Sequence, residues 1–97
     1  MTTYIALGTF AEKGISNIKD SPTRVNDARV AIKKMGGELK SFYYTMGRYD
    51  FATIAEFPNN ETAMTFLLAL GNLGNVKTET LVAIPVDQAA ELIKKIP

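Results

Sequence analysis

Two side chains that carry much of enzyme chemistry are missing from this chain. Its 97 residues include no cysteine and no histidine. Without cysteine there is no disulfide, no zinc–thiolate site, no iron–sulfur ligation and no thiol nucleophile. Without histidine the chain lacks the commonest general base and the usual haem and transition-metal ligand. A metal would need an all-oxygen site from the ten carboxylates. These follow no EF-hand spacing, so we expect no metal and no cofactor.

Charge of one sign and long apolar runs are also scarce. The formal net charge is only +1, whereas nucleic-acid binding depends on clustered positive charge. No apolar run approaches the roughly 20 residues of a membrane span. The first residues lack the basic region and cleavage site of a signal peptide. We therefore expect a cytoplasmic protein that binds neither nucleic acid nor a membrane.

The residues that are present form an ordinary globular composition with a clear alternation of elements. Hydrophobic residues make up 46% and charged residues 22% of the chain, which predicts one domain over residues 1–97 with one core. Periodicity and turn residues predict the following elements in order: a strand over 3–10, a helical stripe over 15–35 broken before Pro22, strands over 38–46 and 50–57, a helix over 61–71, a strand over 76–85 and a last helix after Asp87.

This order predicts an α+β fold, a ferredoxin-like βαββαβ sandwich with a C-terminal helix. Its helices cover one face of the sheet, yet both faces of the strands are apolar. Strict alternation places Ile5 and Leu7 opposite Tyr4 and Phe10, and Leu39 and Tyr43 opposite Phe42 and Tyr44. A bare apolar face of this size is unusual for a monomer. We therefore predict a homodimer, or a larger assembly of dimers, in which two sheets close a dimeric α/β barrel.

The stretch Gly47-Arg48-Tyr49-Asp50 lies between the second and third predicted strands and has two interpretations. In the structural one it is a hairpin connection, where Gly47 takes a positive φ and Asp50 accepts backbone N–H groups. In the functional one, Tyr49 and Asp50 lie at the mouth of the barrel and contact a ligand.

Three further side chains near these strands are candidate ligand contacts. Tyr43 and Tyr44 are adjacent on a strand, so only one of them can line a barrel cavity, either as a hydrogen-bonding phenol or as core. Glu56 is either a buried base or the partner of Lys40 or Lys77 in a salt bridge.

Arg24 is a candidate anion ligand. It follows Pro22 in the first turn of a predicted helix, where a positive charge opposes the helix dipole. We expect it to pair with a carboxylate, such as that of Asp20 or Asp27, or with an anionic ligand bound at that helix end.

Four segments, "KGISNIKDSPTR", "MGG", "YTMGRYDFATIAEFP" and "LGNLGNVKTETLVAIP", resemble the GYD-domain family. This family comprises small, mostly prokaryotic proteins named for a Gly-(Arg/Glu/Gln)-Tyr-Asp turn, whose naming positions are occupied here by Gly47, Tyr49 and Asp50. The resemblance runs from Tyr4 to about Pro97. The family is similar to the dimeric α/β-barrel proteins, which include cofactor-free oxygenases, isomerases, haem-handling enzymes and ligand-sensing domains. The resemblance therefore implies a dimer but no particular activity.

Three functions stay open at this point. The first is a small homo-oligomeric protein that binds a small apolar or aromatic ligand between its sheet and its helices or partner. The second is a cofactor-independent oxygenase or isomerase, with Tyr43 or Tyr44, Glu56 and Asp50 as acid–base groups. The third is an assembly module with no ligand. A cavity of about 300 Å³ or more behind the sheet would favour the first two.

Overall fold

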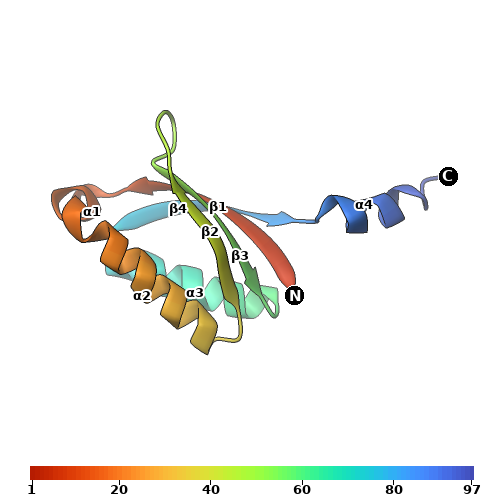
Figure 1. Cartoon of the computed structure of the whole chain (residues 1–97), viewed down its shortest axis with the longest axis horizontal. Coiled ribbons are helices and arrows are strands. Elements are labelled where there is room, and N and C mark those ends of the chain that lie inside the picture. Colours follow the sequence, from red (N-terminus) through yellow and green to blue (C-terminus); the bar gives the residue numbers. More distant parts are fainter.

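The computed structural model describes all 97 residues. The elements are β1 (Thr2–Phe10), α1 (Glu12–Ser16), the 3₁₀ helix η1 (Ile18–Asp20), α2 (Ser21–Lys34), β2 (Glu38–Tyr44), β3 (Phe51–Phe57), α3 (Asn60–Leu73), β4 (Val76–Ala83) and α4 (Val86–Ile93). The four strands form one antiparallel sheet in the order β2-β3-β1-β4. Helices α2 and α3 lie on one face of the sheet and the other face is bare (Figure 1). The predicted ferredoxin-like fold with a C-terminal helix is confirmed.

The helix ends follow the local chemistry of the chain. Pro22 lies in the first turn of α2, where its missing N–H is not needed. Gly36 ends that helix with a φ of 84°, a conformation that favours glycine. The Asn59 side chain caps α3 by accepting a 2.8 Å hydrogen bond from the Thr62 N–H. None of the helices has the length and apolar character required to cross a membrane.

A β-bulge in β2 changes which of its side chains face the helices. The register with β3 shifts between Leu39 and Ser41, so Lys40 is the extra residue. Leu39 therefore shares the helix-facing side with Phe42, and the alternation that placed it with Tyr43 is wrong. The bulge buries Leu39 and leaves the Lys40 side chain in solvent, where its charge stays hydrated.

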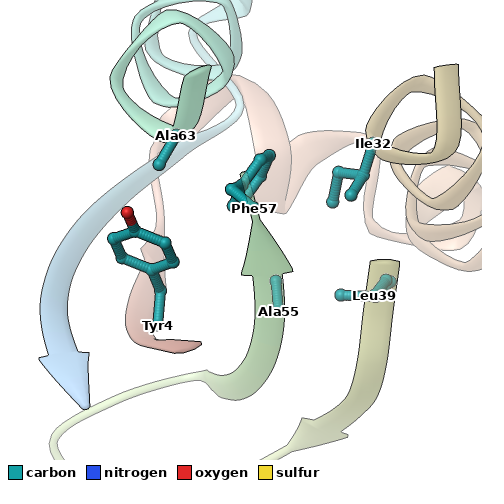
Figure 2. Packing of buried hydrophobic residues seen from close by; sticks show 6 residues of the cluster. All are labelled: Tyr4, Ile32, Leu39, Ala55, Phe57 and Ala63. Atoms are coloured by element: carbon teal, nitrogen blue, oxygen red, sulfur yellow. The ribbon is translucent and has the colours of Figure 1, made fainter. Parts of the chain in front are cut away.

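The buried core is small and lies at one end of the helix–sheet layer. Only 11 of the 97 residues are buried. Six of them form one cluster: Tyr4, Ile32, Leu39, Ala55, Phe57 and Ala63. In Figure 2 the Phe57 ring lies between Ile32 of α2 and Ala63 of α3. These residues come from the end of α2, the start of α3 and the end of β3, so the opposite end of the layer is less tightly filled.

Helix α4 lies apart from the rest of the molecule (Figure 1). The radius of gyration is 14.7 Å, against about 12.5 Å for a compact domain of this length. Its large apolar side chains are exposed: Val86, Leu92 and Ile93, with Ile96 just beyond the helix. The helix therefore finds no cover within its own chain.

A glycine in β1 makes room for three packed aromatic rings. A Cβ atom on Gly8 would lie 1.9 Å from Cζ of Phe51. The Phe51 ring stacks on Phe42 with centroids 5.0 Å apart and lies 5.9 Å from the Phe10 ring. Only a residue without a side chain fits beneath this group.

We predict that Gly8→Ala destabilises the fold by about 1–3 kcal/mol, because Phe51 and its stacked neighbour must move. Urea unfolding measures the change. Gly71→Ala is the matched control: its Cβ would meet nothing within 4 Å, and alanine in α3 should add up to about 1 kcal/mol of stability. If Gly8→Ala changes the free energy of unfolding by no more than Gly71→Ala does, this packing is contradicted.

Candidate functional site

A cavity of about 610 Å³ lies between the sheet and helices α2 and α3. Twenty of the 29 residues that line it are hydrophobic. Sites for small molecules and cofactors are typically apolar clefts of about 300–1,000 Å³. A single chain therefore forms a ligand-sized apolar cavity, which is partly open to solvent.

The cavity exists because small side chains face one another where the core ends. Ala28 and Ala31 of α2, Ala69 of α3 and Ala6 of β1 all line it. The side chains that reach from the sheet to the helices include Tyr4, which donates to Asn60 of α3, and Tyr44, whose hydroxyl lies 2.9 Å from that of Ser21 of α2. Methyl groups are too short to close that distance, so the space stays open.

The strands on the floor of this mainly apolar cavity contribute three threonines, Thr53, Thr78 and Thr80. Ala6 is paired with Thr53 on one side and with Thr80 on the other. The Thr53 hydroxyl donates a 2.6 Å hydrogen bond to the Ser41 carbonyl. The Thr80 hydroxyl is buried and has no hydrogen-bond partner. An unpaired buried hydroxyl is unfavourable by about 1–3 kcal/mol, and the Thr80 oxygen is covered by protein atoms, with almost no surface exposed to the cavity.

The two adjacent tyrosines face opposite sides of the sheet, as predicted. The Tyr44 hydroxyl lies 2.9 Å from the hydroxyl of Ser21 at the start of α2. Tyr44 and Asp50 border a second, smaller hollow of about 330 Å³, while Tyr43 lies on the bare face and is 61% exposed. Neither phenol reaches the main cavity.

Arg24 ties α1 to α2. Its guanidinium donates hydrogen bonds to the carbonyls of Asn17 at 2.9 Å and Gly14 at 3.3 Å. The expected pairing with Asp20 or Asp27 is therefore wrong, because carbonyls left free at the end of α1 supply the negative partner instead. Arg24 also borders the main cavity, and its role toward an anionic ligand stays a prediction.

Glu56 lies on the bare face and not in the cavity. Its carboxylate pairs with Lys40, with a nitrogen–oxygen distance of 3.9 Å, which confirms one of its two predicted salt-bridge partners. No group of three or more acidic side chains is arranged to hold a metal ion. The carboxylate of Glu56 therefore cannot act on a molecule bound between the helices and the sheet.

The Gly47–Asp50 turn is anchored to two other strands. Gly47 has a φ of 108°. Asp50 accepts a 2.8 Å bond from the Phe10 N–H through its carboxylate and donates its own N–H to the Gly8 carbonyl at 2.8 Å. This confirms the structural interpretation of both residues, with the accepted N–H supplied by β1. A direct role of Asp50 or Tyr49 in ligand binding stays a prediction.

Tyr49 extends from this turn to the edge strand β4. Its hydroxyl donates a 2.5 Å hydrogen bond to the Glu79 carboxylate. That bond raises the pKa of the Tyr49 phenol above its ordinary value of 10.0, because ionisation would break it; desolvation adds to the rise, and the nearby Arg48 charge opposes it. Tyr49 and Glu79 thus fasten the turn to the far edge of the sheet.

The side of the sheet opposite the helices is called here the open face. At its centre Ile5 is paired with Ile54 on one side and Leu81 on the other. Ile54 is 36% and Leu81 48% exposed. Five charged residues of both signs surround this apolar row: Glu38, Lys40, Glu56, Lys77 and Glu79. Nothing within the chain covers the row.

Apart from Arg24, the residues that build the cavity were not among the predicted site residues. From the sequence alone, Thr80 and Thr53 are ordinary strand-forming residues and Ala6 is a small core residue. A signal was present in the "VKTET" segment, which places Thr78 and Thr80 on the same face as Val76. Threonines at inward positions of a strand indicate a polar contact, although they do not show whether protein or ligand supplies it.

Two comparisons of the sequence agree with one another. The family model described as GYD domain matches residues 4–93. A curated protein of Thermus thermophilus is 32% identical over 97 residues, an alignment that covers 99% of each chain. That protein is named glutamine synthetase and cystathionine beta-lyase binding protein.

Solved structures share the fold. FFRP-DM1 has a TM-score of 0.63 at 20% identity, with 87% of this chain and 100% of that chain covered. The leucine response regulatory protein of Mycobacterium tuberculosis has a TM-score of 0.57 at 14% identity, with 88% of this chain and 51% of that one covered. A second Thermus thermophilus protein has a TM-score of 0.56 at 22% identity, with 89% and 96% covered. At such identities the likeness shows the fold alone.

We predict that Glu79→Gln lowers the pKa of Tyr49 toward its ordinary value, because it removes the carboxylate that holds the phenol proton. The change is measured as the difference between tyrosine absorbance titrations of each protein and its Tyr49→Phe variant. The raised pKa also means that this bond stabilises the fold below pH 10 and is lost as the pH rises through that pKa. Glu56→Gln is the control, and an unchanged titration in Glu79→Gln would contradict the assignment.

Proposed function

This chain belongs to the GYD domain family, and on that basis we propose that it is a homo-oligomeric protein-binding module whose open face pairs with that of a second copy. The self-association in this proposal rests on the uncovered apolar row of Ile5, Ile54 and Leu81. Full burial of a large aliphatic side chain is worth about 1.5–3 kcal/mol, so covering this row provides a substantial driving force for association.

A second copy suits the size and charge of the open face. Four strands about 4.8 Å apart, with about 25 Å of length each, make a surface of roughly 500 Å² per copy. Two such faces bury roughly 1,000 Å², which is the lower limit for a specific interface. The two lysines and three glutamates around the row leave a net charge of only −1 on each face, so repulsion between two identical faces is small. In a two-fold symmetric dimer the same surface of both copies forms the interface.

Helix α4 adds to the same interface in this proposal. An isolated helix of eight residues is not stable in water and needs a surface to pack on. It follows the edge strand β4 and lies outside its own domain (Figure 1), where it is placed to reach another copy. Burial of Leu92 and Ile93 there would raise the area of the interface above that of the sheets alone.

The second part of the proposal is the binding of another protein. It is supported by the name of the Thermus thermophilus relative, which describes binding to two metabolic enzymes. When two sheets are stacked, the outer surfaces of the helices stay accessible. Met64 and Leu68 lie one turn apart on α3 and are 62% and 68% exposed. A dimer presents this apolar pair twice, which strengthens binding to a target with several subunits.

A second candidate function, the binding of a small molecule, is favoured by the volume and apolar lining of the cavity between the sheet and the helices. Catalysis has less support, because Glu56 and Tyr43 lie on the open face and the carboxylate of Asp50 accepts a bond from the backbone.

We predict that the wild-type protein sediments as a dimer or larger species at micromolar concentration. Leu81→Glu should raise its dissociation constant roughly a hundred-fold or more, because burial of an unpaired charge is unfavourable by about 3–5 kcal/mol. Leu68→Glu makes the same chemical change on α3 and should leave the assembly intact. A monomeric wild-type protein, or a Leu81→Glu variant that sediments like it, would contradict the pairing of open faces.

We also predict that the protein binds glutamine synthetase or cystathionine β-lyase purified from its own host, as measured by isothermal titration calorimetry. Leu68→Glu should weaken this binding about tenfold or more, because an exposed apolar contact becomes a buried charge. Lys95→Glu, at the far end of the chain, is the control. The absence of heat with both enzymes, or unchanged binding by Leu68→Glu, would count against the proposed surface.

A further inference from the structure

We propose that β4, an edge strand of the sheet, pairs with β4 of a second copy, as two antiparallel strands related by a two-fold axis at Thr78. This edge contact lies in the plane of the sheet, whereas the pairing of open faces proposed above stacks one sheet on another. Each contact can therefore form without the other. Where both form, the edge contact joins two open-face dimers into a tetramer.

The sheet has two edges, and only the β4 edge is regular. At the other edge, β2 carries the bulge at Lys40, and a bulge or a lysine protects an edge against further pairing. Strand β4 pairs with β1 over Val76–Ala83 without a register shift and contains no proline. A long, regular edge strand presents a row of free backbone groups to which another strand can bond.

The hydrogen bonds between β1 and β4 show which backbone groups of β4 are free. The Ala11 N–H donates to the Asn75 carbonyl at 2.9 Å, which continues the register that pairs Phe10 with Val76. Hydrogen-bonded pairs alternate along an antiparallel ladder, so the odd-numbered residues of β4 bond to β1. The residues whose N–H and C=O groups point to the free edge are Val76, Thr78, Thr80 and Val82.

Two charged side chains of β4 select the register of the edge contact. Lys77 and Glu79 make no ion pair within the chain. Free backbone groups must meet free backbone groups, so the two-fold axis passes through a residue of β4. An axis at Thr78 places Lys77 of each copy opposite Glu79 of the other. An axis at Glu79 opposes two carboxylates, and one at Thr80 or Leu81 places Glu79 opposite an uncharged side chain.

These charges favour a second copy over a strand from another protein. Opposite charges that face each other across two strands stabilise the pair, and like charges weaken it. The axis at Thr78 forms two such attractive contacts. A foreign strand would need the same alternation of charge, whereas a second copy supplies it.

The side chains at the axis are prepared for this contact. The Tyr49 hydroxyl donates to Oε2 of Glu79 at 2.5 Å, which leaves Oε1 to accept from a lysine. A carboxylate that is already held loses less freedom when it makes a second bond. Thr78 is exposed to solvent, so two copies of it can meet without displacing the core.

The absence of cysteine from the chain allows the register to be tested with a single introduced thiol. Residues of a hydrogen-bonded antiparallel pair have Cα atoms about 5.5 Å apart, which is within the range of a disulfide. We expect Thr78→Cys to form a covalent dimer under mild oxidation. Val82→Cys is the matched control: its backbone also points to the edge, but it lies beyond the paired residues and should stay monomeric on a denaturing gel.

Charge exchange in the Thr78→Cys protein tests the partners of the contact. Lys77→Glu should slow cross-linking about tenfold or more, because two attractive contacts become repulsive. Adding Glu79→Lys restores both contacts and should restore the rate. Adding Glu61→Lys instead, at an exposed position of α3, restores only the net charge and should leave the rate low.

Proline at Thr78 tests the backbone bonds themselves. The N–H that it removes points to the edge, so the ladder with β1 stays intact, and proline is tolerated at such positions of edge strands. Thr78→Pro should sediment with half the mass of Thr78→Val, which keeps the N–H. This comparison uses a concentration at which the wild-type protein is fully assembled.

The edge contact and the open-face contact fail separately. Leu81→Glu should leave the cross-linking of Thr78→Cys unchanged, because Leu81 lies outside the residues that pair about Thr78. Four results would overturn the edge contact: no covalent dimer from folded Thr78→Cys, equal yields from Val82→Cys, no rescue by Glu79→Lys, and equal masses of folded Thr78→Pro and Thr78→Val. If only the open-face pairing is wrong, cross-linking persists while Leu81→Glu sediments like the wild type.

Discussion

The constraint on which the rest of this structure depends is a four-stranded sheet that is apolar on both faces but has helices on only one. In β1, Tyr4 points into the helix-covered core while its neighbour Ile5 points to the open face. The helices cannot cover both. The second face finds no cover within the chain, and neither does the exposed apolar side of α4. The proposed self-association therefore follows from how the strands are built and requires no special motif.

The two faces of the sheet are suited to different tasks. The open face carries a continuous aliphatic row, which suits contact with a like surface. The covered face carries Ala6 between two threonines, and the helices above it contribute alanines, so a cavity remains where a core would otherwise be. The Gly47–Asp50 turn contacts two strands of the sheet. The carboxylate of Asp50 accepts a hydrogen bond from the backbone at the end of β1, and the Tyr49 hydroxyl donates one to Glu79 on the edge strand β4. The proposed dimer interface and the cavity therefore lie on opposite faces of the sheet.

Much of the fold could be predicted from the sequence, because alternation and helix-ending residues are local signals. The element order, the two apolar faces and the positive φ of Gly47 followed from them, and Lys40 was one of the two partners expected for Glu56. Three features could not. The bulge at Lys40 depends on the register with β3, and the carbonyl partners of Arg24 depend on where α1 ends. The cavity depends on the distance between helices and sheet, which no periodicity reports. The candidate site was accordingly predicted less well than the fold.

The central claim, that a second copy covers the open face, is tested most directly by isotope-filtered nuclear Overhauser measurements on a mixture of labelled and unlabelled protein. Only contacts between different copies give a signal in such a sample. The account predicts intermolecular signals among the methyl groups of Ile5, Ile54 and Leu81, which lie at the centre of that face. A sample of folded protein in which these methyl groups show signals only within their own chain would contradict it.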